Sequence, residues 1–314
     1  MEIFLTTLSQ TAVLFVFIAL GYVLMCCRFL PDNAQTVLSK MENLIFIPAL
    51  VLGTFINNFT VEKMAMARDV LLFSLLLALV CLLLSAPMAR LCSRDAYEKR
   101  IYRYGLCFSN FGFMGNAIVS ALFPDIFMEY LIFTLPLWSL IYLWGAPVLL
   151  MAEGGKVTVR QRLKSFMNPM FACTVLGMLI GITGLKMPAF VSAAVSSAGD
   201  CMSPLAMLLT GMTIAQFDLK KVVSIPGVYK ATALRLLVFP ALILLFLLVC
   251  PLPRAFAVCA VCALSMPLGL NTIIIPAAYG KDTRIAAGMA LVSHVLSCIT
   301  IPVVFMLFEI ITKK

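Results

Sequence analysis

Two short stretches of the sequence combine asparagine and glycine, the second with a proline as well, inside otherwise apolar runs. The first is SNFGFMGN, residues 109–116, and the second is SMPLGLNT, residues 265–272. Proline removes a backbone donor and glycine permits an irregular backbone, so both stretches can interrupt a helix. An interrupted helix inside a membrane exposes amide N–H groups, whose partial positive charge can hold an anion without Arg or Lys. The residues nominated for such a site are Asn110, Gly112, Gly115, Asn116, Pro267, Asn271 and Thr272.

Tight helix packing through small residues, with asparagine bonding between helices, is the competing interpretation. For one stretch alone, packing would be the better explanation. The two stretches occupy equivalent places in the two halves of the chain, and this symmetry favours a substrate-binding site.

Two ionisable side chains in apolar runs are candidates to carry a coupling ion. Asp200 is the one carboxylate deep inside a predicted span, and we expect a low-dielectric setting in which it binds H⁺ or Na⁺. A bend that brings Asp200 to an aqueous surface agrees equally well with the sequence. His294 is the only histidine and has a side chain suited to proton exchange. The competing interpretation is that His294 simply bonds to a neighbouring helix.

Two further charged residues lie near the ends of predicted spans. Glu42 follows Lys40 by two residues, and an interfacial ion pair between them is favoured over a substrate role. Arg235 is expected to extend to the cytoplasmic interface, with attraction of an anion as the second interpretation.

The elements that carry these residues are predicted to be membrane-spanning helices. Hydrophobic residues make up 63% of the 314 residues and charged residues 12%, which excludes a soluble globular protein and a disordered chain. A spanning helix needs about 20 apolar residues. Ten runs approach or exceed this length: 3–27, 43–61, 70–89, 104–124, 130–152, 165–185, 187–217, 236–253, 255–280 and 285–308.

Basic residues set the predicted orientation, because cytoplasmic loops of membrane proteins are enriched in Lys and Arg. The connections after odd-numbered spans carry 16 of these residues and the opposite side carries 6. We therefore expect the odd-numbered connections to face the cytoplasm and both termini to face outward. The basic residues form short clusters between apolar runs, so the lipid bilayer is the expected partner and nucleic acid is not.

Matching landmarks in the two halves predict an internal repeat. Three pairs of residues are each separated by 155 to 157 positions: Pro48 and Pro204, Asp125 and Asp282, Pro147 and Pro302. Five spans in each half would insert in opposite orientations. Residues 1–153 and 154–314 are therefore predicted to be two inverted five-helix repeats of an all-α integral membrane protein, an arrangement typical of secondary transporters.

Other function classes fit the sequence less well. The chain has no HExxH, GxGD or Walker A motif, so we expect neither an enzyme nor an ATP-driven pump, and no cofactor. An ion channel would more often show a pore-lining repeat in an oligomer. A cation/proton antiporter or a sodium-coupled symporter of related fold stays as the alternative, although Asp200 has no adjacent acid.

These motifs resemble those of the auxin efflux carrier family of membrane transporters, over nearly the whole chain. Residues 109–116 are similar to that family's N-x-G-[FY]-x-G-x-P motif, through Asn110, Gly112, Phe113 and Gly115. Ala117 stands where the family has proline, so a break here would depend on the glycines and on Asn116. Three further matches follow in order: Asn168-Pro169 with Gly177, Ser265-Met266-Pro267, and AAYGKD at residues 277–282.

The resemblance implies an architecture shared with bile acid/sodium symporters and certain sodium/proton antiporters. Spans 4 and 9 would unwind and cross at the membrane centre. Spans 1, 2, 6 and 7 would form a scaffold domain, and spans 3–5 and 8–10 a transport domain that moves against it as an elevator. The resemblance adds Asn168 to the binding residues. It implies a small organic anion, such as auxin, malate or malonate, carried across the cytoplasmic membrane. Coupling to H⁺, to Na⁺ or to neither stays open, as does the oligomeric state, a homodimer included.

Overall fold

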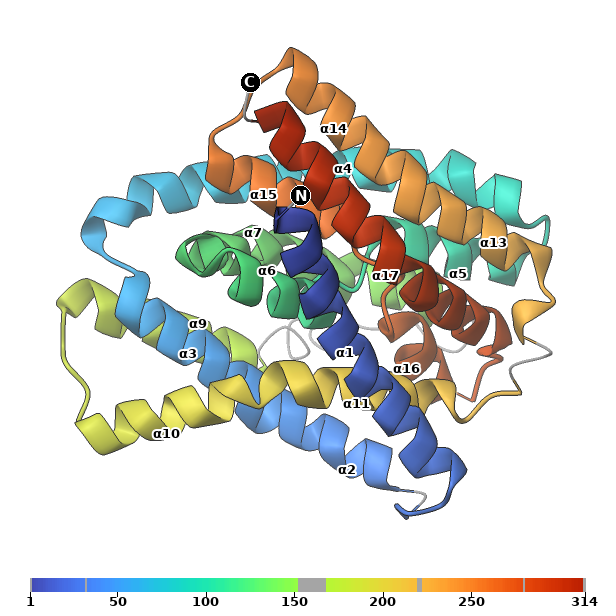
Figure 1. Ribbon diagram of the computed structural model, residues 1–314, viewed down its shortest axis with the longest axis horizontal. Helices are drawn as coiled ribbons and strands as arrows, with labels where there is room; N and C mark the ends of the chain where they lie inside the picture. The colour runs from blue at the N-terminus through green and yellow to red at the C-terminus, as the bar shows by residue number, and fades with distance from the viewer. Residues whose placement is uncertain (1, 32, 152–167, 219–221, 279, 313–314) are drawn as a thin grey trace.

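The computed structural model describes residues 2–31, 33–151, 168–218, 222–278 and 280–312, and helices are its regular elements (Figure 1). Inside a bilayer every backbone polar group must be satisfied within the chain, and a helix does this locally. The first half contains α1 (Glu2–Cys26), α2 (Ala34–Met41), η1 (Glu42–Phe46), α3 (Ile47–Asn58), η2 (Val61–Lys63), α4 (Met64–Cys92), α5 (Ala96–Cys107), η3 (Phe111–Gly115), α6 (Asn116–Leu122), η4 (Pro124–Ile126), α7 (Phe127–Leu140) and η5 (Ile141–Leu150). The second half contains α9 (Pro169–Thr183), α10 (Ala189–Asp200), α11 (Met202–Ile214), α13 (Pro226–Ala233), η6 (Leu234–Val238), α14 (Phe239–Val249), α15 (Arg254–Ser265), α16 (Asn271–Ala278) and α17 (Arg284–Thr312).

Six of the predicted spans are continuous helices long and apolar enough to cross a membrane. They are Leu5–Cys26, Ala34–Asn58, Val61–Cys92, Pro124–Leu150, Pro226–Val249 and Arg284–Thr312. The predicted spans 4, 6 and 9 contain shorter apolar helices, Phe111–Leu122, Pro169–Thr183 and Arg254–Ser265. The predicted span 7 is divided into α10 and α11 by a turn at Cys201. The count of ten spans and the inverted repeat therefore stay predictions. The boundary at 153/154 and the basic cluster of residues 156–164 lie outside the described residues.

The helices pack in two groups that α1 and α11 help to join. In one group α3 packs against α9 and α10, and α11 packs against α1 and α2. In the other group α4 packs against α5, α7 and α13, and α17 packs against α13, α14 and α15. Helix α1 also packs along α17 (Figure 1), and α11 contacts η3. We call the first set, α1–α3 and α9–α11, the lower group, and the second, α4–α7 with η3–η5 and α13–α17, the upper group.

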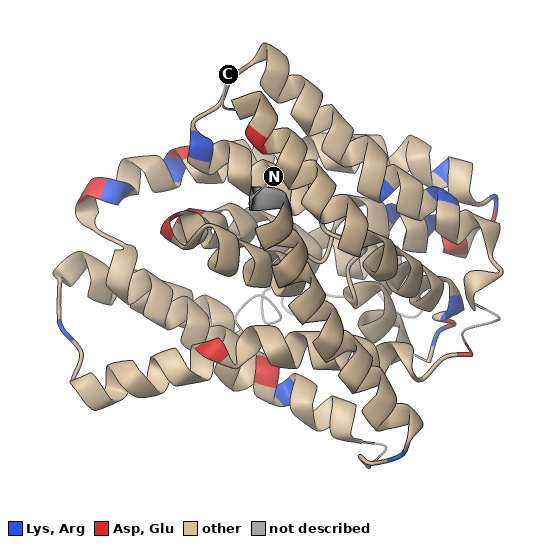
Figure 2. Ribbon diagram, in the orientation of Figure 1, with Lys and Arg blue, Asp and Glu red and all other residues tan. Residues whose placement is uncertain are grey.

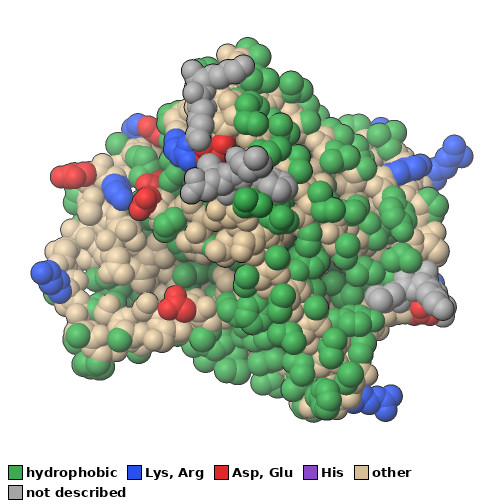
Figure 3. All heavy atoms as spheres, viewed as in Figure 1, with side chains coloured by type: hydrophobic (Ala, Val, Ile, Leu, Met, Phe, Trp, Pro, Cys, Tyr) green, Lys and Arg blue, Asp and Glu red, His purple; other side chains and the backbone are tan. Residues whose placement is uncertain are grey.

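The outer surface agrees with a protein that lies in lipid. Large apolar side chains are exposed along the long helices, for example Leu83 on α4 and Val249 on α14. Lys, Arg, Asp and Glu lie mostly toward the periphery of the ribbon (Figure 2), and hydrophobic side chains cover much of the face in Figure 3. A water-soluble monomer would not expose apolar patches of this extent.

Candidate functional site

Two helices of the upper group are interrupted, as the sequence predicts. Helix α5 ends at Cys107, and after Phe108–Asn110 the chain enters the π-helical turn η3 and then α6. Helix α15 ends at Ser265, and after residues 266–270 the chain enters α16. The break around Pro267 is therefore confirmed. The first break lies upstream of Gly112, Gly115 and Asn116, so the expectation that these residues make it is wrong.

The two breaks contact each other directly, and this contact explains the position of the first one. The backbone N–H of Asn110 donates to the carbonyl oxygen of Pro267 over 2.8 Å, and Ser109 and Leu268 form an antiparallel bridge. The side chain of Ser109 donates to the carbonyl of Ala263 over 2.7 Å. A Cβ atom on Gly269 would lie 3.1 Å from the carbonyl oxygens of both Phe108 and Ser109, so a glycine permits this close approach. Backbone groups that the two helices leave unpaired are thus satisfied across the contact.

Helix α17 supplies side chains to both breaks. The hydroxyl of Ser293 accepts from the N–H of Leu268 over 3.1 Å. Nε2 of His294 lies 2.9 Å from Nδ2 of Asn110, and Nδ1 lies 2.7 Å from the carbonyl oxygen of Ala290. Because a carbonyl only accepts, Nδ1 carries the hydrogen, and in neutral His294 the Nε2 atom accepts from Asn110. Asn110 is 2% exposed and His294 is 1% exposed, so this pair is enclosed by protein.

Arg235 holds the ends of both interrupted helices. Its Nη1 donates to the carbonyl of Leu106, in the last turn of α5, over 3.0 Å. Its Nη2 and Nε donate to the carbonyls of Ala263 and Met266, at the end of α15, over 2.6 and 3.2 Å. The guanidinium also lies over the ring of Phe239, 5.0 Å from its centroid. A helix C-terminus carries partial negative charge, so one cation offsets two helix ends.

Arg235 lies inside the protein and not at the cytoplasmic interface expected for it. Its side chain is 1% exposed and does not extend to an interface. Within the described part of the chain, the ion pairs join other residues, and none includes Arg235. An arginine isolated in the apolar run Ala231–Val249 could have indicated a buried guanidinium. The carbonyls that accept its hydrogen bonds, however, come from elsewhere in the chain.

The other nominated residues have different surroundings. Gly112 and Gly115 pack under the side chains of Trp138 and Tyr130, where a Cβ atom would overlap the ring or the hydroxyl. These glycines therefore serve close packing of η3 against α7. The hydroxyl of Thr272 donates to the carbonyl of Gly269 over 2.7 Å, which shapes the start of α16. Asn271 lies at the first residue of α16, beside the hydroxyl of Tyr104.

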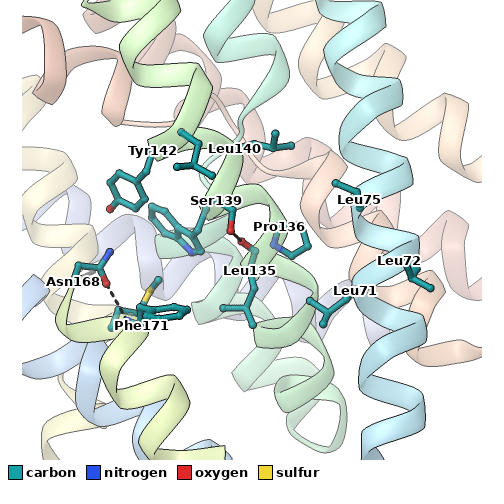
Figure 4. A pocket seen from close by; sticks show the side chains of 13 residues that line it. Leu71, Leu72, Leu75, Leu135, Pro136, Ser139, Leu140, Tyr142, Asn168 and Phe171 are labelled. Carbon is teal, nitrogen blue, oxygen red and sulfur yellow. Dashed lines mark hydrogen bonds between the residues drawn. The ribbon is translucent and has the colours of Figure 1, made fainter. Parts of the chain in front are cut away.

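Asn168 lies apart from the place where the two helix breaks meet, residues 108–110 and 266–270, which we call the crossing. It caps α9 by accepting the N–H of Phe171 over 2.9 Å, as the dashed line in Figure 4 shows. It also lines an apolar pocket of ≈ 490 Å³ between α4, α7, η5 and α9, whose walls include Leu72, Pro136 and Tyr142. This lining offers little to a small carboxylate.

Two acids differ from expectation. Asp200 is exposed at the end of α10, on the rim of a groove between α3 and α10, and no described contact joins it to the crossing. Helix α10 ends there, which agrees with the bend considered as the alternative interpretation for this residue. Glu42 is 0% exposed and both carboxylate oxygens lack hydrogen-bond partners. The expected ion pair with the exposed Lys40 is therefore wrong, since residues two apart do not share a helix face.

One comparison with known protein families finds a match over most of the chain. A family model described as membrane transport protein matches residues 6–305, which includes both interrupted helices, Arg235 and His294. No curated protein matches the chain.

Proposed function

Because the chain belongs to the auxin efflux carrier family of membrane transporters, we propose that it carries a small organic anion and binds it where the two interrupted helices meet. The observation that supports this proposal most strongly is Arg235. A buried guanidinium bonded to Leu106, Ala263 and Met266 offsets the negative ends of α5 and α15. The positive N-terminal ends of η3 and α16 then dominate the local field, and an anion is attracted to them.

The carboxylate of the substrate would accept hydrogen bonds from backbone N–H groups at the start of η3, because the first N–H groups of a helix have no carbonyl of an earlier turn to bond. At the start of α16 the N–H groups of Thr272 and Ile273 already donate to the carbonyls of Gly269 and Leu270, so this helix end would attract the carboxylate through its positive dipole. Asn110 and Asn271 stand at these two starting points and offer side-chain amides to a second polar group of the substrate. A site built from hydrogen-bond donors and positive helix ends is suited to mono- and dicarboxylates of small size.

Transport would follow from movement of the upper group against the lower group, in the manner of an elevator. The crossing lies within the upper group, and α1, α3 and α11 of the lower group pack against α6, α7, α17 and η3. We place the protein in the cytoplasmic membrane with its odd-numbered connections inside, on the asymmetry of Lys and Arg.

His294 is the proposed carrier of a coupling proton. Its Nε2 accepts from Asn110 in the neutral form. Protonation of Nε2 would remove that acceptor and turn the Asn110 amide so that its oxygen faces the ring. Substrate binding and proton binding would then compete for, or share, the same asparagine.

A ligand screen tests the binding site. The melting temperature of the purified protein is measured with small mono- and dicarboxylates, because a ligand that binds the folded state raises it. Asn110→Ala and Asn271→Ala should each weaken binding about tenfold, the effect of one or two lost hydrogen bonds. Asn43→Ala is the matched control, since Asn43 is exposed and bonds its own helix at Ser39. No response to any carboxylate, or full affinity in both variants, would overturn the proposal.

A further inference from the structure

A second polar cluster lies between the two helix groups, outside the crossing. Asn116 of α6 and Thr134 of α7 face Thr174 of α9 across a cavity of ≈ 10 Å³. Val51 and Phe55 of α3, with Leu131, Leu135, Trp138 and Met170, complete the lining. This volume holds about one water molecule or one small ion. The cavity is therefore bounded by α3 and α9 of the lower group and by α6 and α7 of the upper group.

The three polar side chains present acceptor oxygens. The hydroxyl of Thr134 donates its hydrogen to the carbonyl of Leu131 over 2.8 Å. The hydroxyl of Thr174 donates to the carbonyl of Met170 over 2.9 Å. A hydroxyl has one hydrogen, so each threonine has lone pairs left for a ligand. Asn116 is 5% exposed, and its Oδ1 is buried without a hydrogen-bond partner.

A buried acceptor without a partner costs free energy, so these oxygens call for a ligand that carries positive charge or donates hydrogen. The lining residues include no carboxylate, thiolate or imidazole, which argues against a divalent or transition metal. Neutral hydroxyl and amide oxygens suit a hard monovalent cation. We propose that this cavity binds Na⁺, with Asn116, Thr134 and Thr174 as ligands.

Because of its location, the bound ion would affect how the two helix groups lie relative to each other. Its ligands come from both helix groups, so bound Na⁺ stabilises the arrangement in which α6 and α7 lie against α9. Any relative movement of the groups separates Thr174 from Asn116 and Thr134 and releases the ion. This conformational role rests on the proposed alternation of the two groups, whereas Na⁺ binding itself does not. Asn116, nominated from the sequence for substrate, is then a ligand of the cation.

Thermal stability in matched salts tests the site in the purified full-length protein. The melting temperature is measured in NaCl, KCl and choline chloride at constant ionic strength. It should rise with NaCl along a saturable curve and stay nearly flat in choline chloride. Thr174→Val keeps the shape and removes one oxygen, so it should weaken Na⁺ binding about tenfold. Asn116→Asp adds a negative charge beside the ion and should strengthen Na⁺ binding about tenfold or more.

Thr54→Val is the control. Thr54 makes the same local bond, to the carbonyl of Leu50 over 2.8 Å, but lies outside the cavity. This variant should respond to Na⁺ as the parent does. Equal responses to all three salts, or a Thr174→Val protein that still responds as the parent does, would show that the cavity holds only water and would overturn the proposal. Carboxylate binding is measured separately in potassium buffer, so failure of the cation site leaves the anion site untouched.

Discussion

Replacement of Arg235 tests the electrostatic core of the proposed site. Arg235→Met removes the charge and the three donated hydrogen bonds and keeps much of the side-chain length. Hydrogen bonds from charged donors contribute about 1.5–3 kcal/mol each, so the gross loss is roughly 5–9 kcal/mol. Burial of a guanidinium costs several kcal/mol, and the variant no longer carries that cost. We expect a net loss of about 2–4 kcal/mol of stability, seen as a fall of about 5–15 °C in melting temperature.

Binding of a carboxylate should fall as well. Arg235 bonds carbonyls at the two helix ends that border the proposed site, and loss of its charge should lower affinity at least tenfold, about 1.4 kcal/mol or more. Arg235→Lys keeps the charge but cannot reach three carbonyls with a planar fork. It should therefore lose stability and keep most of its affinity. Affinity is read by isothermal titration with the best carboxylate from the ligand screen.

Arg68→Met provides the control, because Arg68 is exposed and pairs with its neighbour Asp69 at the surface. That variant should change stability by less than about 1 kcal/mol. The reasoning is refuted if Arg235→Met melts at the parent temperature, or if it binds carboxylate as tightly as the parent does. The first result would mean that the helix ends do not depend on the guanidinium. The second would mean that the anion site lies elsewhere.

Two further substitutions separate the remaining acid and base candidates. His294→Gln should abolish the response of transport to a pH gradient and leave downhill exchange of substrate intact. Asp200→Asn, at an exposed residue, should leave both unchanged. Uptake into proteoliposomes with and without a pH gradient decides between the two residues. Glu42→Gln should change the free energy of unfolding by less than about 1 kcal/mol, because neither carboxyl oxygen of Glu42 has a hydrogen-bond partner that the substitution would remove; a large loss of stability would show that Glu42 is paired.

The sequence located the second helix break more accurately than the first, for a physical reason. Pro267 removes a backbone donor wherever the chain folds, so its effect is local. The first break, at Phe108–Asn110, contains no proline or glycine and depends on bonds to Pro267 and Leu268 in the other half of the chain. Such a break depends on tertiary contacts, which the local sequence does not reveal. The prediction therefore placed it at the nearby glycines in 112–115. The same holds for Arg235, whose three acceptors lie in other helices.

Helical geometry alone argues against the ion pair expected of Glu42. Lys40 and Glu42 are two residues apart in one helical segment and therefore point in different directions. For Asp200 the sequence left a span interior and a bend equally open, and the turn at Cys201, a feature of the fold, agrees with the bend. The cation cavity could not be found from sequence, because Thr174 reaches Asn116 and Thr134 through the packing of separate helices.

The placement of charge at the crossing favours an anion carrier over the cation/proton antiporter of related fold. A carrier that binds cations between helix ends needs carboxylates near the positive N-termini, to reverse the local field. Here the one exposed acid of α10, Asp200, lies on another surface, and the buried acid Glu42 lies in the lower group. The charge that does stand at the crossing is a guanidinium, and it offsets the negative helix ends. At the proposed site the positive helix N-termini would then dominate, and a carboxylate is the ligand that they attract. A small cation would find its neutral oxygens in the separate cavity at Asn116, away from the substrate. The two ligands would then not contact each other. Any coupling between them would pass through the movement of α6 and α7 relative to α9.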